Sequence, residues 1–231
     1  MNFDNIILCV PTKKNDYENK DFAKNIHLTI GCKYKLIFCF NKGEHSLTEI
    51  YSQFFNEVKN QENSIIIFLH DDIEFVTLGW GKELLRIFNE NQDFGIIGIA
   101  GTKSYDGEKP WWQTDNKLGK VIHSQPMKGS WMSSYSDDLP NDVEECAVID
   151  GLFIAINPNN IKINFDKEIK GFHFYDIDFC LGNLFYGECK IGVTTKIRLI
   201  HYSVGKFSEQ WEINRKQVFE KYKDKLPINV H

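Results

Sequence analysis

The sequence predicts an α/β protein with a mostly parallel central sheet flanked by helices. Three short, mainly apolar runs, at residues 5–10, 35–40 and 64–69, are typical of strands that are buried on both faces. After the second and third runs, apolar residues recur at three- and four-residue steps, which is the spacing of one helix face. Strands that alternate with packed helices form parallel sheets with the helices crossing over their faces.

The helix after the second run carries a start signal of its own. Ser46 and Glu49 have the spacing of a capping box, in which each side chain bonds the backbone amide of the other residue. The apolar stripe that follows consists of Leu47, Ile50, Tyr51, Phe54, Phe55 and Val58. A second helix is expected around residues 80–88, and residues 94–100 predict another buried strand.

Residues 101–145 are irregular, since glycines and prolines interrupt them and only residues 120–123 alternate like a strand. Three of the five tryptophans fall here, and a long irregular segment inside a compact domain is usually functional. Regular structure is expected to resume with a strand at 146–157, broken at Asp150-Gly151. The remaining expected elements are a helix at 174–186 ending at Gly187, a strand at 191–200 and a terminal helix capped by Ser208.

Composition limits the function classes. The 231 residues are 42% hydrophobic and 26% charged, which is typical of a globular domain and excludes a disordered or fibrous chain. The net charge of -5 argues against nucleic acid as a partner. No secretory signal or apolar run of membrane-spanning length is present, and the six cysteines include no CxxC pair. We therefore expect a cytoplasmic protein with reduced cysteines and no structural zinc.

His70-Asp71-Asp72 directly follows the third apolar run. Ligands of open parallel sheets bind beyond the carboxyl ends of the strands, so these side chains are expected at a cleft. Two adjacent carboxylates repel each other unless a cation or hydrogen-bond donors satisfy them, and oxygen ligands favour Mg2+ or Mn2+. The alternative is that Asp71 and Asp72 only begin a turn.

Asp176 and Asp178 stand at the start of the helix predicted at 174–186. Either carboxylate could simply stabilise the helix N-terminus, or one could serve as a general base. Side chains two positions apart on a helix point in nearly opposite directions, so at most one of them faces a given cleft. His201, at the end of the last expected strand, is either a metal ligand or a plain surface residue.

In this order, the three sites resemble bacterial glycosyltransferase family 2 enzymes with a GT-A fold. The likeness is closer to the short "glycosyltransferase-like" branch, in which a strand ends in an HDD-type motif. It extends from Asn5 to about Trp211. The matching segments are 46–51, 65–73 (IIIFLHDDI), 94–101 (FGIIGIAG), 148–153 (VIDGLF), 172–181 (FHFYDIDFCL) and 200–203 (IHYS).

The resemblance implies a single domain over residues 1–231, with a nucleotide-binding half at 1–100, an acceptor and catalytic half at 101–205 and a C-terminal helix at 206–231. It also implies the reaction, which is transfer of a sugar from a nucleotide diphosphate to an acceptor hydroxyl with inversion. The donor favoured is a UDP-sugar, and the acceptor is a saccharide or glycolipid of bacterial surface-polysaccharide synthesis.

The family pattern also implies roles for individual residues. Asp72 aligns with the second Asp of the metal-binding motif and His201 with the family's metal-binding His, with Asp71 close by, so Mn2+ or Mg2+ is the implied cofactor. Asp176 aligns with the catalytic base. The nucleoside is expected at Pro11, Thr12, Asn41 and His70, and the donor sugar and acceptor at Asp150, Gly151, Trp111, Trp112 and Asp178.

Several alternatives stay open. The chain departs from the family pattern at His70, at Tyr175, which replaces an acidic partner, and at Gly182, where relatives often carry Arg. Asn41 either contacts the nucleoside or only starts a turn. Trp111 and Trp112 either stack on a sugar or pack in the core. Rival functions are a non-catalytic carbohydrate- or nucleotide-binding protein on a decayed transferase fold and a metal-dependent carbohydrate hydrolase. Peripheral membrane association is compatible with the sequence, and the oligomeric state is open.

Overall fold

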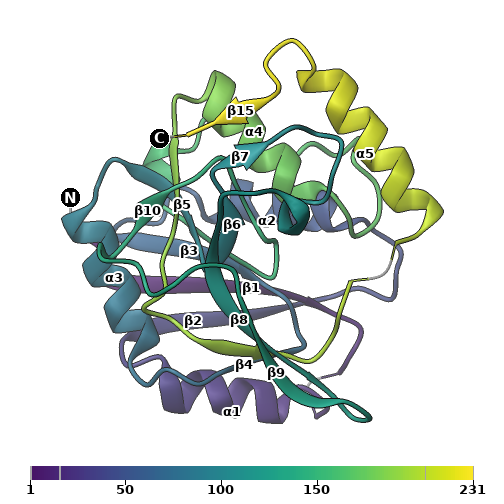
Figure 1. Ribbon diagram of the computed structural model, residues 1–231. Coiled ribbons are helices and arrows are strands. Elements are labelled where there is room, and N and C mark those ends of the chain that lie inside the picture. The colour runs from purple at the N-terminus through teal and green to yellow at the C-terminus, as the bar shows by residue number, and fades with distance from the viewer. Residues whose placement is uncertain (1, 16, 206, 231) are drawn as a thin grey trace.

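Two mixed β-sheets with five α-helices around them form the structure, a computed structural model that describes residues 2–15, 17–205 and 207–230 (Figure 1). The larger sheet has the strand order β10–β13–β5–β12–β3–β1–β2. Five of these strands point the same way, while β10 and β12 run against them. The sheet is therefore mostly parallel in strand direction, as predicted. Its strands are β1 (Asn5–Thr12), β2 (Lys33–Phe40), β3 (Ser64–Leu69), β5 (Phe94–Gly98), β10 (Glu144–Glu145), β12 (Phe153–Ile156) and β13 (Lys190–Val193).

The smaller sheet has the order β11–β6–β8–β14–β4, and β9 pairs with β8 as a long hairpin. A separate pair joins β7 near the middle of the chain to β15 near its end. The strands of these sheets are β4 (Ile73–Phe75), β6 (Ala100–Thr102), β7 (Ser104–Tyr105), β8 (Lys117–Gln125), β9 (Gly129–Ser134), β11 (Val148–Ile149), β14 (Leu199–His201) and β15 (Ile228–Asn229).

All four predicted helices are confirmed, two of them with the caps that the sequence predicts. Ser46 accepts from the Glu49 amide while Glu49 accepts from the Ser46 amide, so the capping box is formed. Ser208 likewise accepts from the amide of Trp211. The helices are α1 (Lys20–Thr29), α2 (Leu47–Val58), α3 (Trp80–Glu90), α4 (Tyr175–Tyr186) and α5 (Glu209–Tyr222), with 3-10 turns η1 (Trp111–Gln113) and η2 (Pro158–Asn160).

Three details at the helices differ from expectation. Helix α1 was not predicted, because it buries only Ile26 and Thr29 and its N-cap forms no side-chain hydrogen bond. Gly187 stands at the C-cap of α4 as predicted, but its backbone is right-handed. It must be small because a Cβ there would press on the Asn183 carbonyl. The C-terminal segment is not all helix, since β15 follows α5 and pairs with β7.

Three runs that were read as single strands each divide between the two sheets. Residues 94–100 become β5 and β6, residues 146–157 become β11 and β12, and residues 191–200 become β13 and β14. The strands on either side of each crossing are largely buried, so no stretch of exposed residues marks the crossing in the sequence. The break predicted at Asp150-Gly151 is the crossing between β11 and β12.

The segment 101–145, expected to be irregular, contains the β8–β9 hairpin and several short strands. Five of the six residues of β9 are exposed, so it has no apolar face that a sequence pattern could reveal. The six cysteines are all free thiols. Within the described residues, every helix is too short or too polar to cross a membrane.

Candidate active site

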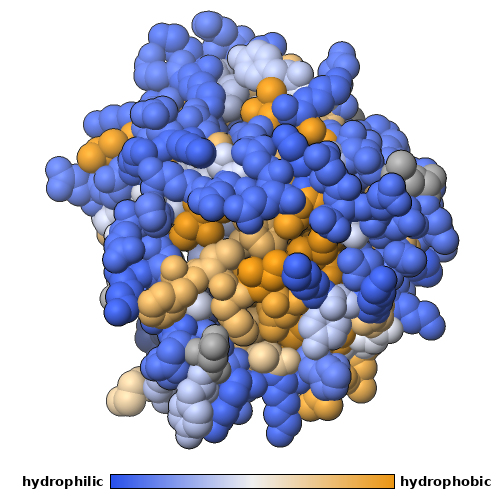
Figure 2. Space-filling model, turned by 180° about the vertical axis from the view of Figure 1, so that it is seen from behind, coloured by the Kyte–Doolittle hydropathy of each residue, from blue (hydrophilic) through white to orange (hydrophobic). Residues whose placement is uncertain are grey.

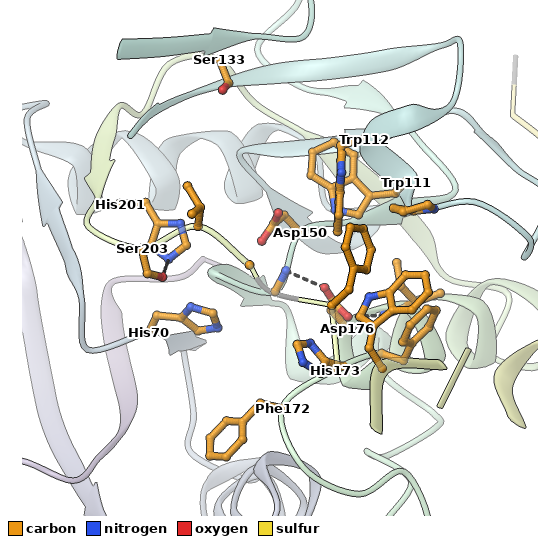
Figure 3. A pocket seen from close by; sticks show the side chains of 18 of the residues that line it. His70, Trp111, Trp112, Ser133, Asp150, Phe172, His173, Asp176, His201 and Ser203 are labelled. Carbon is orange, nitrogen blue, oxygen red and sulfur yellow. Dashed lines mark hydrogen bonds between the residues drawn. The ribbon is translucent and has the colours of Figure 1, made fainter. Parts of the chain in front are cut away.

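A cavity of about 480 Å3 opens at the edge of the two sheets, beyond the ends of β3 and β14 (Figure 3). The rings of His70 and His201 lie on one side of it, Trp111 and Trp112 lie on the other, and Asp150 and Asp176 lie between them (Figure 3). The lining side chains that can carry chemistry are His70, His123, Asp150, His173, Asp176, His201 and Ser203.

Sheet pairing brings His201 to the motif after β3. Asp72 is followed at once by β4, and β14 pairs antiparallel with β4 so that His201 lies opposite Ile73. Nε2 of His201 lies 3.4 Å from Oδ1 of Asp72, and Nδ1 of His70 lies 3.8 Å from the same oxygen. Ligand atoms of these three residues all lie within 4.8 Å of one another, which could accommodate one metal ion.

The charges in this cluster suit a cation. Burial alone would raise the pKa of Asp72, but the hydrogen bond from His201 and the charges of both histidines hold it below its usual range. Burial and the neighbouring His201 lower the pKa of His70, which favours the neutral imidazole that a metal needs. Although burial opposes it, Asp72 raises the pKa of His201. A metal ion would take the place of that proton.

Asp71 is held away from this cluster. Its Oδ2 accepts a 2.6 Å hydrogen bond from Thr12 at the end of β1 and lies 3.5 Å from Nζ of Lys14. Lys14 also donates to the Asp71 carbonyl. His70, which was expected to contact the nucleotide, occupies the place in the His-Asp-His group that was expected for Asp71.

Asp176 is half-buried in the first turn of α4 and lines the cavity. Its Oδ2 accepts from the Gly151 amide at 2.8 Å, drawn as a dashed line in Figure 3, and its Oδ1 accepts from the Ile177 amide. Burial and the charge of Asp150 raise the pKa of Asp176 to about 7, although the two amide bonds oppose that shift. A carboxyl group with such a pKa can take up or release a proton near neutral pH.

Gly151 meets Tyr175 at the floor of the site. A Cβ at residue 151 would overlap the Tyr175 ring and its hydroxyl, so the close approach requires glycine here. That approach also carries the Gly151 amide to Asp176. Asp150, next to it, turns its carboxylate back to the Leu152 amide and lines the cavity.

Asp178 and Gly182 lie elsewhere. Asp178 pairs with Lys221 of α5 at 2.7 Å and accepts from the Tyr222 hydroxyl, so it joins two helices and does not line the cavity. Gly182 lies on the buried side of α4 against Ile163 and Tyr222. An arginine there would enter the core, so the absence of one removes nothing from this cavity.

The two remaining predicted nucleotide residues have different surroundings. Asn41 is buried, and its side-chain oxygen accepts from the amides of residues 43–45, which fixes the turn after β2. This is the structural role that the sequence left open. Pro11 is the last residue but one of β1. It is half-buried and lies opposite Cys39 of β2.

The aromatic side of the cavity has an inner and an outer tryptophan. Trp111 is 3% exposed and packs edge-on against Tyr135 and Trp112. Trp112 is 38% exposed, and Phe172, across the cavity, is 50% exposed. Trp111 therefore packs in the core, whereas Trp112 presents a free face, so stacking on a sugar stays a prediction for Trp112 alone.

Sequence reasoning missed two histidines of the site. His123 lines the cavity, with its ring 5.8 Å from that of His201 and stacked on Trp131. His173 also lines it, half-buried, two residues before the start of α4. The only sequence signal for His123 was its place in the short alternating stretch at 120–123, and its pairing with His201 arises only when β8 and β14 join.

Comparisons with known proteins agree with this arrangement. The model of a glycosyltransferase-like family matches residues 5–222. A solved structure of GalNAc-T7 with UDP, GalNAc and Mn2+ superposes with a TM-score of 0.56 at 10% sequence identity. That match covers 96% of this chain and 49% of the other, so this chain spans about half of that protein's length. No curated protein matches the chain in sequence.

The structural match shows a GT-A fold, and the family match covers nearly the whole chain. The chain belongs to the glycosyltransferase-like family.

Proposed function

We propose that this protein is a metal-dependent, inverting glycosyltransferase that moves a sugar from a nucleotide diphosphate to an acceptor hydroxyl. One observation carries the proposal. His70 and His201, two members of the His70–Asp72–His201 group, line the same cavity as the half-buried carboxyl of Asp176, which supports a cation site and a proton acceptor in one space. This is the pair of functions that the reaction needs.

The metal would be held by His70, Asp72 and His201. Two imidazoles and one carboxylate suit Mn2+ better than Mg2+, which prefers an all-oxygen shell. When bound, such an ion neutralises the negative charge that builds up on the leaving diphosphate. The GalNAc-T7 structure contains Mn2+ together with UDP, which supports the same ion for this site.

Asp176 would accept the proton of the attacking hydroxyl. Its carboxylate is fixed by the amides of Gly151 and Ile177, so it enters the reaction already oriented. Asp150, close enough to raise the Asp176 pKa, makes that carboxylate a stronger base. Attack on the face opposite the leaving group gives inversion.

The end of β1 would hold the nucleotide of the donor, for which UDP is favoured. Thr12 and Lys14 are fixed there by Asp71, next to the metal-binding Asp72. Lys14 would therefore supply positive charge to the diphosphate. The exposed face of Trp112 would stack on a sugar ring.

The acceptor we propose is a saccharide or glycolipid of bacterial surface-polysaccharide synthesis, and the site of action is the cytoplasmic side of the membrane. The open cavity, lined by aromatic side chains as well as carboxylates, supports an amphipathic acceptor of this kind.

The direct test is thermal unfolding of the full chain with UDP, with and without Mn2+. We expect UDP to raise the melting temperature only when Mn2+ is present, and Asp72→Ala to remove the shift. Asp224→Ala, at an exposed carboxylate on the C-terminal side of α5, serves as the control. An equal UDP shift without metal would contradict the metal site. Turnover of a panel of nucleotide sugars with Mn2+ then separates a transferase from a binding protein or a hydrolase.

A further inference from the structure

The larger sheet ends at β2, whose outer edge pairs with no other strand of the described residues. Helix α2 packs over β1 and β3. The side chains from Leu36 to Cys39 are only half-buried, and Phe40 is 56% exposed. Figure 2 shows apolar side chains gathered in the middle of the rear face of the molecule, with hydrophilic side chains around them. Exposed apolar side chains along the edge strand of a sheet are typical of an interaction site.

This part of the chain is also strongly basic. Residues 13–42, which run from the end of β1 through α1 and β2, carry seven lysines and three acidic residues. That gives the segment a net charge of +4, in a chain whose total is -5. Lys33, Lys35 and Lys42 are exposed and have no carboxylate partner among the residues that the structure describes. We call the exposed surface of residues 13–42 the β2 flank.

Aromatic rings and ammonium groups are paired on the β2 flank. Nζ of Lys42 lies 5.6 Å from the centre of the Phe40 ring. Nζ of Lys20 lies 4.3 Å from the ring of Tyr17, which is 75% exposed. At a membrane surface, such a ring can enter the headgroup layer while the adjacent ammonium group meets anionic phosphates.

The β2 flank borders the mouth of the cavity. Lys13 lies beside Gly43 in the turn after β2, and its Nζ is 5.9 Å from the ring of Phe172. Phe172 is half-exposed and lines the cavity. A surface bound to the β2 flank would therefore lie next to the opening through which an acceptor enters.

We propose that the β2 flank docks on an anionic lipid bilayer. A second copy of the chain is a poorer partner, because two copies of the β2 flank, each with a net charge of +4, would repel each other. A purely acidic partner would not account for the exposed Phe40 and Tyr17. The docking does not depend on the transfer reaction, although it would carry the cavity to an acceptor held in the membrane.

Co-sedimentation of the full chain with sucrose-loaded vesicles tests the proposal. One set of vesicles is phosphatidylcholine alone, and the other contains 30% phosphatidylglycerol. We expect binding only to the second set, falling as salt is raised. Lys33→Glu with Lys35→Glu should weaken it by at least fivefold for each lysine. Phe40→Ser should weaken it further.

Matched controls lie on α5. Lys216→Glu with Lys223→Glu makes the same charge change at exposed lysines, and Ile213→Ser removes an exposed apolar side chain. These variants should bind vesicles like the parent. Equal losses of vesicle binding in the control and β2-flank variants would show that binding depends only on the net charge of the chain, and would overturn the proposal.

Two further results would also overturn it. One is that the parent protein does not sediment with anionic vesicles. The other is that it forms a dimer in solution which Phe40→Ser dissociates, while vesicles are not bound. The β2-flank variants should keep the Mn2+-dependent UDP shift, so failure of docking is distinguishable from failure of the proposed transferase function.

Discussion

The hydroxyl of Tyr175 lies 2.7 Å from Nε2 of His70. These are two of the positions at which the chain departs from the glycosyltransferase pattern, and they touch. Nδ1 of His70 faces Asp72, so its other ring nitrogen is left for Tyr175. Tyr175 thus orients a histidine of the proposed metal site, and the two departures form one unit.

Tyr175→Phe is expected to weaken metal binding while leaving the fold intact. The ring would keep its packing against Tyr51, but His70 would lose its orienting bond. Loss of such a partner typically reduces metal affinity 10- to 100-fold. The measurement is the Mn2+ concentration that gives half of the UDP-induced melting shift. Tyr186→Phe, at an exposed ring on the same helix, is the control, and an unchanged Mn2+ requirement in Tyr175→Phe would contradict the assignment.

Asp176→Asn and Asp178→Asn should have opposite consequences, although the two residues are neighbours on α4. Asp176→Asn removes the base, so we expect kcat to fall by about 10²–10⁴ while Mn2+-dependent UDP binding persists. Asp178→Asn breaks the pair with Lys221 and should cost about 1–3 kcal/mol of stability, with turnover of the folded protein retained. Turnover by Asp176→Asn at the parental rate would exclude Asp176 as the base.

The pH profile should show the ionisation of Asp176. A base must be deprotonated to act, and the pKa of Asp176 in the free protein is about 7. We therefore expect kcat/KM to level off above about pH 7 and to fall about tenfold for each pH unit below it. Because Asp150 contributes to the raised pKa, Asp150→Asn should move this limb to lower pH. If the fall of kcat/KM occurs at the same pH in Asp150→Asn, the ionisation belongs to a group other than Asp176.

Gly151→Ala should destabilise the protein. The added methyl would overlap the buried Tyr175 ring, and overpacking of this kind typically costs about 1–3 kcal/mol. Gly205→Ala is the control, because a Cβ there meets no atom within 4 Å. Urea unfolding measures both variants. Equal stability of the two would mean that the Gly151–Tyr175 contact relaxes at little cost.

Local patterns predicted much of the fold. The capping box at Ser46, the cap at Ser208 and the buried strands β1 and β3 depend on neighbouring residues, and all are present. The hairpin β8–β9 could not be predicted in this way, because β9 is stabilised by pairing with β8 rather than by an apolar face. The crossings between sheets were concealed because burial continues through them.

The sequence by itself determined the α/β class, the capped helix starts at Ser46 and Ser208 and the candidate residues Asp72, Asp176 and His201, because apolar periodicity, capping spacing and the family motif are all carried by short segments. Only the tertiary structure decided which side chains meet. The pairing of β14 with β4 and β8 places His201 beside Asp72 and His123. The position of the first turn of α4 places Tyr175 against His70 and Gly151. These contacts join residues about 25 to 130 positions apart, and no local pattern encodes them because they depend on how whole strands and helices pack.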